Sequence, residues 1–195
     1  MTGFRIITLD DLSSALGEES LNHLLLQYSC PRNSDIESFL HHNAVPFSRQ
    51  GIAKTHLVFA GFHEKAVLVG YFTLASKTLY IPDRVRLSAS LRKRLSRFSA
   101  RIDETHMTVI AAPLIAQLGK NYQNGYDALI TGDELLGMAC DTIQRTQLAI
   151  GGKVAYLECE DIPGLVRFYE SNGFQRFSER ESDNHERLIQ MIRYF

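Results

Sequence analysis

Leu129-Ile130-Thr131-Gly132-Asp133-Glu134 is the stretch in which an apolar segment ends and a long amphipathic helix begins. Thr131 and Glu134 have the spacing of a capping box, in which each side chain accepts a hydrogen bond from the backbone N–H of the other residue. Gly132 would let a ligand approach the backbone closely. Unpaired N–H groups and the positive end of the helix dipole then favour an anion such as a phosphate. The same pattern fits an ordinary capped helix, so this stretch alone leaves both interpretations open.

Length and charge limit the kinds of protein that this chain can be. The chain has 195 residues, of which 45% are hydrophobic, and a formal net charge of −1 at pH 7. This length allows one sizeable core, so we expect a single domain over residues 1–195. A net charge near zero argues against a general nucleic-acid binder, although it does not exclude a local basic patch.

Cysteine spacing and hydropathy predict the cellular compartment. Cys30, Cys140 and Cys159 are odd in number and far apart, which favours neither a disulfide framework nor a zinc site. We therefore expect the reducing cytoplasm. The N-terminal residues lack the pattern of a signal peptide, and the longest apolar run, residues 109–118, is too short to span a membrane. We expect no contact with a membrane.

Periodicity and turn signals predict a mixed series of strands and helices. The expected strands cover residues 4–9, 55–62, 67–75, 106–118, 154–159, 174–177 and 188–194. The expected helices cover residues 10–28, 34–43, 87–102, 131–150 and 163–171. A second capping box, Ser34 with Glu37, starts the second helix, and Pro46 lies beyond its end. Pro113, inside the fourth strand, predicts a break in strand pairing.

The segment 87–102 combines an apolar face with a basic one. Its apolar residues have the spacing of one helical face. Basic residues occupy the other positions: Arg92, Lys93, Arg94, Arg97 and Arg101. The pattern fits a surface helix with a solvated basic face, and it also fits a helix that binds RNA or another polyanion with salt-sensitive affinity.

The C-terminal third carries a resemblance to a known family. Residues 155–159, Ala-Tyr-Leu-Glu-Cys, and residues 165–174, Leu-Val-Arg-Phe-Tyr-Glu-Ser-Asn-Gly-Phe, resemble the fifth strand and the following helix end of GCN5-related N-acetyltransferases (GNAT). The strand-loop-helix unit over residues 109–140 is similar to the acyl-CoA pyrophosphate site of this family, and residues 70–74 fit its third strand. The resemblance covers nearly the whole chain.

The resemblance implies a fold and a reaction. The fold is an α/β (α+β) acyl-CoA acyltransferase fold, with a mixed, mostly antiparallel central sheet of about seven strands flanked by helices. The reaction is direct attack of a primary amine on the thioester of acetyl-CoA, without a covalent enzyme intermediate. We therefore expect Cys159 to be a core residue and not a catalytic thiol.

The resemblance also assigns the residues that would bind acetyl-CoA. Backbone groups of Gln117, Leu118 and Gly119 would contact the pantetheine arm. The loop and helix start would receive the pyrophosphate, through Ile130, Thr131, Gly132, Asp133 and Glu134. Gly132 is the only glycine of the family's phosphate loop that this chain matches, and acidic side chains repel a phosphate. The backbone would therefore have to hold the phosphate.

Tyr169 matches the family tyrosine that donates a hydrogen bond to the departing sulfur. An ordinary tyrosine pKa near 10 lies above a thiol pKa near 8.5, so Tyr169 is better described as a hydrogen-bond donor than as a full acid. The alternative is a tyrosine that only packs at a helix end. Glu104, His106 and Glu158 are possible general bases, but no motif assigns the role to any of them. The seven histidines lack metal-ligand spacing, so we expect no metal.

The acceptor is left open by the sequence. It is a small-molecule or macromolecular amine, and the lack of an evident base favours an amine of low pKa. A looser resemblance links the N-terminal half to acetyltransferase toxins that act on aminoacyl-tRNA, through Cys30, Asp35, Phe39, Leu40, Ala44, Gly51, Thr55, Gly70 and Tyr71. A non-catalytic acyl-CoA-binding module is the other alternative. Whether the protein forms a homodimer is also left open.

Overall fold

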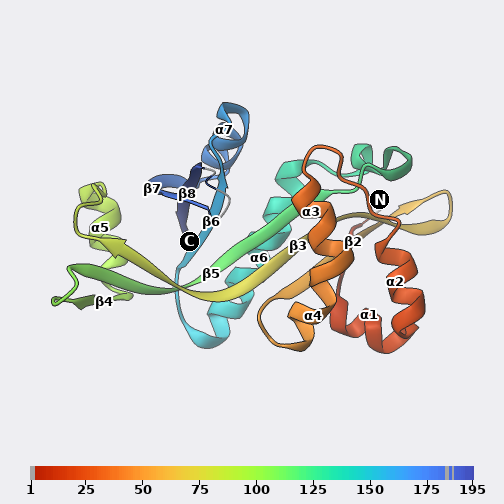
Figure 1. Cartoon of the computed structure of the whole chain (residues 1–195), viewed down its shortest axis with the longest axis horizontal. Helices are drawn as coiled ribbons and strands as arrows, with labels where there is room; N and C mark the ends of the chain where they lie inside the picture. Colours follow the sequence, from red (N-terminus) through yellow and green to blue (C-terminus); the bar gives the residue numbers. More distant parts are fainter. Residues whose placement is uncertain (1–2, 183–184, 186) are drawn as a thin grey trace. The chain divides into compact units, whose positions relative to one another are not determined.

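The computed structural model describes residues 3–182, 185 and 187–195. The strands are β1 (Arg5–Thr8), β2 (Lys54–Phe62), β3 (Lys65–Pro82), β4 (Ser99–Ile102), β5 (Met107–Lys120), β6 (Val154–Glu160), β7 (Gln175–Glu181) and β8 (Arg187–Tyr194). The α-helices are α1 (Leu9–Leu16), α2 (Glu18–Leu25), α3 (Ser34–Ser38), α4 (Ala44–Arg49), α5 (Ala89–Leu95), α6 (Gly132–Ile150) and α7 (Pro163–Ser171) (Figure 1). A π-helix, η1 (Phe39–Asn43), and a 3₁₀ segment, η2 (Gln123–Leu129), complete the elements.

The strand topology confirms the expected fold class. Hydrogen bonds connect the strands in the order β1-β2-β3-β5-β6-β8-β7, and β4 pairs with β5 outside this path. The pairs β1–β2, β2–β3, β4–β5, β6–β8 and β7–β8 are antiparallel, whereas β5–β6 is parallel. A parallel pair needs a crossover connection, and α6 supplies it. β4, which the sequence did not predict, is the addition to the expected strands.

The chain forms two compact units. The first unit comprises Met1–Ala75 and Ala116–Ala139, and the second comprises Ser76–Ile115 and Cys140–Phe195. Strands β3 and β5 and helix α6 each contribute residues to both units. The single domain expected from the sequence stays a prediction. In the described part of the chain, no helix is both long and apolar enough to cross a membrane.

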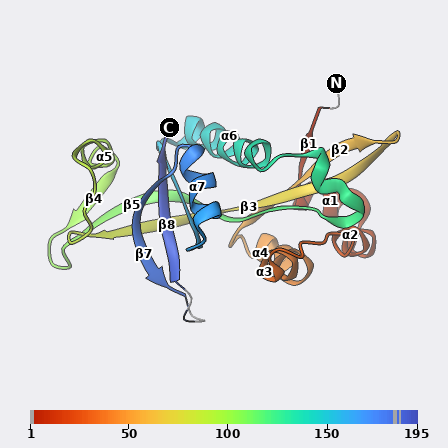
Figure 2. The ribbon, with the colours of Figure 1, turned by 90° about the horizontal axis from the view of Figure 1, so that it is seen from above.

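The first unit builds its core between its helices and strands β1 to β3. Figure 2 shows α2, α3 and α4 on one side of β3. Leu21 and Leu25 of α2 are almost fully buried, as are Leu57 of β2 and Tyr71 of β3. The predicted hairpin is confirmed, because β2 and β3 pair from Lys54 with Leu74 to Phe62 with Lys65.

The helical region around Pro46 differs from the prediction. Asn33 caps α3 by accepting hydrogen bonds from the N–H groups of Asp35 and Ile36, so the predicted capping box of Ser34 and Glu37 is wrong. The carboxylate of Glu37 instead accepts a hydrogen bond from the N–H of Cys30, at 2.6 Å.

The chain also continues helically past Asn43, through η1 into α4, instead of ending there. In η1 the N–H of Ala44 bonds to the carbonyl of Phe39, five residues back. Pro46 then falls in the first turn of α4, where its missing N–H costs least.

The predicted helix over residues 87–102 is also wrong in its second half. Helix α5 ends at Leu95, and Ser99–Ile102 forms β4, which pairs with β5 from Ser99–Ile110 to Ile102–Met107. Phe98 and Ile102, assigned by periodicity to a buried helix face, are 36% and 38% exposed. Only Leu91 and Leu95 keep the predicted burial. After the turn that follows Leu95, strand pairing with β5 therefore decides the structure of residues 99–102, although their apolar spacing is helical.

The second unit has its own core beneath α5. Leu91 and Leu95 belong to one apolar cluster with Ile110 of β5, Tyr156 of β6 and Ile192 of β8. Helix α7 contacts β6 and β7. Burying these side chains anchors α5 to the sheet, because a seven-residue helix has little stability by itself.

Gly119 of β5 provides a test of packing in the first unit. A Cβ atom at this position would lie 2.4 Å from the hydroxyl of Tyr28 and 2.6 Å from Cγ2 of Ile36. Gly119→Ala should therefore lower the free energy of unfolding by about 1–3 kcal/mol, as overpacking does. Gly137→Ala in α6 is the matched control. It has no atom within 4 Å of its Cβ and should be stabilising by about 0.5–1 kcal/mol. Urea denaturation measures both, and equal stability of Gly119→Ala and wild type would contradict the close approach.

Candidate functional site

The start of α6 has the predicted capping box. The N–H of Glu134 donates to Oγ1 of Thr131 at 3.1 Å, and both the N–H and the hydroxyl of Thr131 donate to Oε2 of Glu134 at 2.8 Å. The backbone hydrogen bond from Thr131, followed by that from its hydroxyl, lowers the pKa of Glu134. The carboxylate is thus turned back onto the cap, as the sequence suggested.

The capping box changes which backbone groups an anion can use. The N–H groups of Thr131 and Glu134 are both occupied within the box. The N–H of Gly132 bonds to nothing within the described residues, and Gly132 is the first residue of α6. Gly132 therefore has an N–H that is left for a ligand at the positive end of the helix dipole, whereas those of Thr131 and Glu134 are not.

Ile130 does not require the left-handed conformation that a glycine would supply in the family's phosphate loop. Its backbone is extended, with φ of −141° and ψ of 139°, and its side chain is 2% exposed. The positive φ values of this loop fall instead on Asn124 and Gly125, at 53° and 74°. The side chain of Ile130 therefore packs in the core of the first unit, and any contact of Ile130 with a ligand would be through its backbone.

Lys120 and Asn121 hold the loop, and sequence reasoning missed both. Nζ of Lys120 donates to the carbonyls of Asp127, at 2.9 Å, and Ile130, at 3.2 Å. The buried amide of Asn121 donates to the carbonyl of Leu68 at 2.8 Å, and its Oδ1 accepts from the N–H of Ser29 at 3.0 Å. The signal that could have found them is their position, because they are polar residues at the end of β5, where the loop begins.

The predicted pantetheine-binding residues lie at the end of β5, in the same unit as the loop. Gln117 and Leu118 are half-buried, and Gly119 is buried. The carbonyl of Gly119 approaches Gly70 of β3 so closely that a Cβ there would lie 2.9 Å from it. The structure thus brings Gln117, Leu118, Gly119 and the loop into one unit, whereas Tyr169 belongs to the second unit.

The family-like motif around Tyr169 has a local physical explanation. Helix α7 ends in a Schellman motif, in which the N–H of Phe174 bonds to the carbonyl of Tyr169 and the N–H of Gly173 bonds to that of Glu170. Gly173 supplies the required positive φ, 82°. The rings of Phe174 and Tyr169 pack edge to face, with centroids 5.9 Å apart. The motif therefore fixes the backbone that carries the Tyr169 side chain.

Burial sets the protonation of Tyr169. The residue is 8% exposed, and this burial, followed by the nearby Cys159, raises the pKa of its hydroxyl above the ordinary value near 10. The hydroxyl therefore keeps its proton at neutral pH. A higher pKa makes full proton transfer to a thiolate less favourable than for an ordinary tyrosine, so the chemistry available to Tyr169 is hydrogen-bond donation.

Cys159 lies in the core of the second unit. It is 6% exposed, and burial, followed by Asp161, raises the pKa of its thiol to about 11. A thiol with this pKa is almost fully protonated at neutral pH and is a poor nucleophile. Cys30 and Cys140 are likewise free and buried. Across residues 3–182, 185 and 187–195, no three histidine, cysteine or acidic side chains cluster as metal ligands would.

None of the possible general bases is poised for that role. Burial acts to raise the pKa of Glu158, but hydrogen bonds from Arg180 and Gln190 outweigh it, so the pKa is lowered. Nε of Arg180 lies 2.9 Å from both carboxylate oxygens of Glu158. Glu104 and His106 are exposed at the turn between β4 and β5. Roughly 25 Å of strand separates His106 from Leu114, the first β5 residue that pairs with β6.

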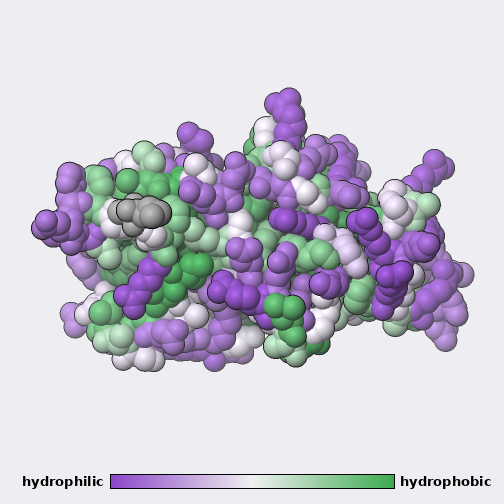
Figure 3. Space-filling model, turned by 180° about the vertical axis from the view of Figure 1, so that it is seen from behind, coloured by the Kyte–Doolittle hydropathy of each residue, from purple (hydrophilic) through white to green (hydrophobic). Residues whose placement is uncertain are grey.

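A cluster of exposed cations surrounds α5 in the second unit. Figure 3, in which α5 and β4 lie at the right, shows mostly hydrophilic residues there. Six exposed cations of this region form no ion pair with any described residue: Arg84, Arg86, Arg92, Lys93, Arg94 and Arg97. Arg101, by contrast, lies on β4 and pairs with Asp83 at 2.8 Å and Asp103 at 2.6 Å. We call these six residues the basic cluster. It replaces the basic helix predicted up to Arg101.

Comparison with known proteins identifies the fold. No protein-family model and no curated protein matches the chain. Solved structures do. A Tyr-to-Phe mutant of KacT has a TM-score of 0.63 at 13% identity, over 96% of this chain and 94% of that one. AtaT complexed with acetyl-methionyl-tRNAfMet has a TM-score of 0.61 at 18% identity, over 96% and 94%.

A structure described as a bacterial toxin matches over all of this chain and 92% of its own, with a TM-score of 0.64 at 15% identity. The chain has the fold of these toxins. The GNAT-like fold class expected from the sequence is therefore confirmed. At these identities the likeness is one of fold, and the chemistry has to be argued from the residues of this chain.

Proposed function

We propose that the protein is an acetyl-CoA-dependent N-acetyltransferase that acylates a primary amine in the cytoplasm. The observation that carries this proposal is Tyr169, a buried and protonated tyrosine set at the end of α7 by a Schellman motif. The shared fold supports it, because AtaT has been solved with acetyl-CoA. The free, buried cysteines agree with a reducing compartment.

The start of α6 fits the phosphates of acetyl-CoA. The N–H of Gly132 is available there, and Lys120 binds the carbonyls of Asp127 and Ile130 in the preceding loop. Backbone groups of Gln117, Leu118 and Gly119 would hold the pantetheine arm. When bound, acetyl-CoA supplies an activated thioester. The side chains of Asp133 and Glu134 would contribute nothing favourable, because their charge repels a phosphate.

Tyr169 would act on the leaving group. As the amine nitrogen attacks the carbonyl carbon, the new C–N bond forms and the C–S bond breaks, and negative charge develops on sulfur. A hydroxyl that donates a hydrogen bond to this charge stabilises the transition state more than the ground state. The amine must lose its proton before it attacks. Glu104, His106 and Glu158 are poorly placed to take that proton, which favours an acceptor that is partly neutral near pH 7.

We propose aminoacyl-tRNA as the acceptor class, and a small-molecule amine is the alternative acceptor. A non-catalytic acyl-CoA-binding module is the alternative to an enzyme. An α-amine, with a pKa near 7.7–8.0, is roughly 10–20% neutral at pH 7, whereas a lysine amine is below about 0.1%. The basic cluster around α5 offers unpaired charge to an RNA backbone. The complex of AtaT with acetyl-methionyl-tRNAfMet supports the same acceptor.

Gly132→Val tests the phosphate site. A β-branched side chain at the helix start would obstruct the close approach of a phosphate to the Gly132 N–H. We expect acetyl-CoA affinity, measured by calorimetry, to fall at least tenfold. Gly137→Val, within the same helix and with open space at its Cβ, is the matched control and should bind acetyl-CoA like the wild type. Equal affinities of the two variants would exclude this loop as the phosphate site.

Tyr169→Phe tests the chemistry. Loss of the hydroxyl should lower turnover by on the order of 10²-fold with acetyl-CoA affinity unchanged. Release of free thiol reports the rate, and Tyr80→Phe, an exposed tyrosine of the same unit, is the control. Because burial raises the pKa of Tyr169, the wild-type rate should show no loss through ionisation of this residue below pH about 10. An unaffected rate in Tyr169→Phe would remove the residue from the mechanism.

A panel of acceptors tests the substrate class. We expect acetyl transfer from acetyl-CoA to the α-amine of charged tRNA at a higher kcat/KM than to free amino acids or lysine peptides. The same tRNA after deacylation should accept nothing. Acetylation of small amines and not of charged tRNA would support a small-molecule amine as the acceptor. Thermal stabilisation by acetyl-CoA without transfer to any acceptor would support the non-catalytic module and overturn the enzyme.

A further inference from the structure

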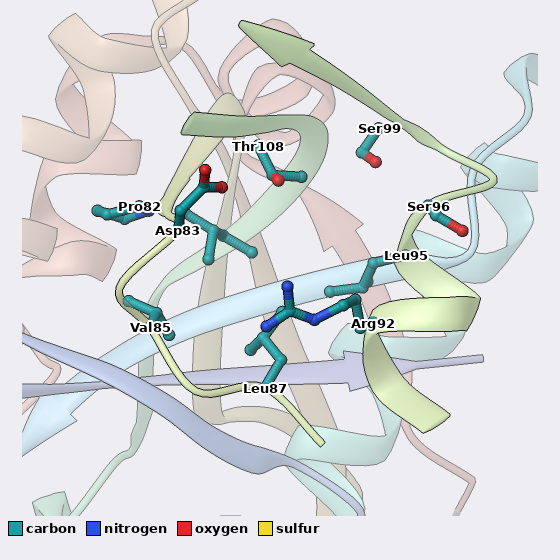
Figure 4. Close-up of a pocket in the computed structure, with 10 residues that line it drawn as sticks. Pro82, Asp83, Val85, Leu87, Arg92, Leu95, Ser96, Ser99 and Thr108 are labelled. Carbon is teal, nitrogen blue, oxygen red and sulfur yellow. The ribbon is translucent and has the colours of Figure 1, made fainter. Parts of the chain in front are cut away.

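A hollow lies beside the C-terminal part of α5, in the second unit, and Arg92 of the basic cluster lines it. It measures about 70 Å³, and its lining comes from the end of β3, the segment that leads into α5, α5 itself, β4 and β5. Figure 4 shows Arg92 extending from α5 toward Val85 and Leu87, while Asp83 and Thr108 lie close together on another side. The candidate acetyl-CoA residues in the first unit do not contribute to it.

The lining combines an apolar floor with a polar rim. The side chains of Ile81 and Leu95 are 2% and 1% exposed, so they form a fixed floor. The rim carries three hydroxyl groups, from Ser96, Ser99 and Thr108. The Ser96 hydroxyl donates to the carbonyl of Lys93 at 2.9 Å and can therefore only accept from a ligand. The hydroxyls of Ser99 and Thr108 can donate or accept. A flat ring with polar edges matches this combination, because its faces need apolar contact and its edges need hydrogen bonds.

Charge decides which kind of ring-bearing molecule fits. The two ionic groups of the rim differ: Asp83 is neutralised by Arg101, at 2.8 Å, whereas Arg92 has no carboxylate partner in the described part of the chain. Around the hollow, the other five cations of the basic cluster are also unpaired. A small molecule that is neutral or cationic as a whole would form no ion pair with these cations. A polyanion gains at several positions at once.

The neighbouring aromatic side chains also fit nucleic acid. Phe98, just beyond α5, is 36% exposed, and its ring lies 6.1 Å from that of Tyr194. Arg94 lies over the Tyr194 ring at 5.3 Å. Tyr194 is half-buried and packs against the apolar cluster of the second unit, so Phe98 is the exposed ring of the two. A cation beside an exposed aromatic ring is a usual setting for an unpaired base, because the base can stack on the ring while its phosphate meets the cation. An acidic peptide would use the cations but not the rings.

We propose that this hollow binds the base of one unpaired nucleotide of an RNA, with Arg92 at its edge and the rest of the basic cluster on the flanking phosphates. The proposal deepens the assignment of aminoacyl-tRNA as acceptor and rests on it for the identity of the RNA. It adds a distinction within the cluster. Arg92, which lines the hollow, contributes to recognition of an unpaired base, whereas Arg97, which does not line it, contributes charge alone.

The matched variants Arg92→Gln and Arg97→Gln test this distinction. Each removes one exposed guanidinium from the same region, so general electrostatics predicts equal effects. The probes are a labelled RNA hairpin with an unpaired 3′ overhang and a fully paired hairpin of the same length. Binding is measured by fluorescence anisotropy over a range of salt concentrations. The full chain carries Tyr169→Phe, so that binding is observed without turnover.

The expected outcome separates base recognition from charge. Arg97→Gln should weaken both RNAs by the same factor and lower the slope of log affinity against log salt by about 0.7–0.9. Arg92→Gln should weaken the overhang hairpin about tenfold more than the paired hairpin. Ser99→Leu, which fills the hollow without a change in charge, should reproduce this selective loss. Ser90→Leu, on α5 but outside the hollow, should not.

Three outcomes would overturn the proposal. The first is an equal loss for both hairpins in Arg92→Gln and Ser99→Leu. The second is equal affinity of the reference chain, which carries Tyr169→Phe alone, for the two hairpins. The third is displacement of RNA by polyglutamate at equal charge concentration, which would assign the hollow to an acidic protein segment. None of these results concerns acetyl transfer, so the acetyltransferase assignment could fail in its own assay while base binding holds, and the reverse.

Discussion

The buried amide of Asn121 is the interaction on which the first unit depends. Its nitrogen bonds to the carbonyl of Leu68 on β3, and its oxygen accepts from Ser29 and Gln123. One side chain thus joins a central strand, the segment after α2 and the loop before α6. Leaving any of these polar groups unpaired in the core would cost about 1–3 kcal/mol. With the loop held there, Lys120 can reach its carbonyls and Thr131 can cap α6.

The two candidate sites use backbone geometry in opposite ways. At the start of α6, the capping box occupies the N–H groups of Thr131 and Glu134, whereas the Gly132 N–H is left for a ligand. At the end of α7, the Schellman motif satisfies the carbonyls of Tyr169 and Glu170 and fixes the backbone that carries the Tyr169 side chain. The Glu134 carboxylate is likewise held on the cap by Thr131. In both places the backbone positions the chemistry.

Local sequence signals predicted what local forces control. The capping box of Thr131 and Glu134, the hairpin of β2 and β3, and the Pro163 start and Gly173 end of α7 depend on residues a few positions apart. Such signals failed where a distant partner competed. Glu37 bonds to Cys30 instead of closing a cap with Ser34, and Ile102 pairs with Met107 instead of continuing α5. The periodicity of apolar residues carries no information about a distant strand that can pair with the same segment.

By itself, the sequence determined the order of most elements and the local structure around Tyr169, because periodicity, caps and turn residues act over short distances. The fold class followed from the resemblance of the C-terminal residues to a known family. Only the tertiary structure decided what burial and long-range contact control. It placed Ile130 in the core, brought Lys120 and Asn121 onto the loop, raised the pKa of Tyr169, and divided the predicted basic helix between free cations and the paired Arg101. Each of these depends on which distant atoms come within a few ångströms, and no local pattern contains that information.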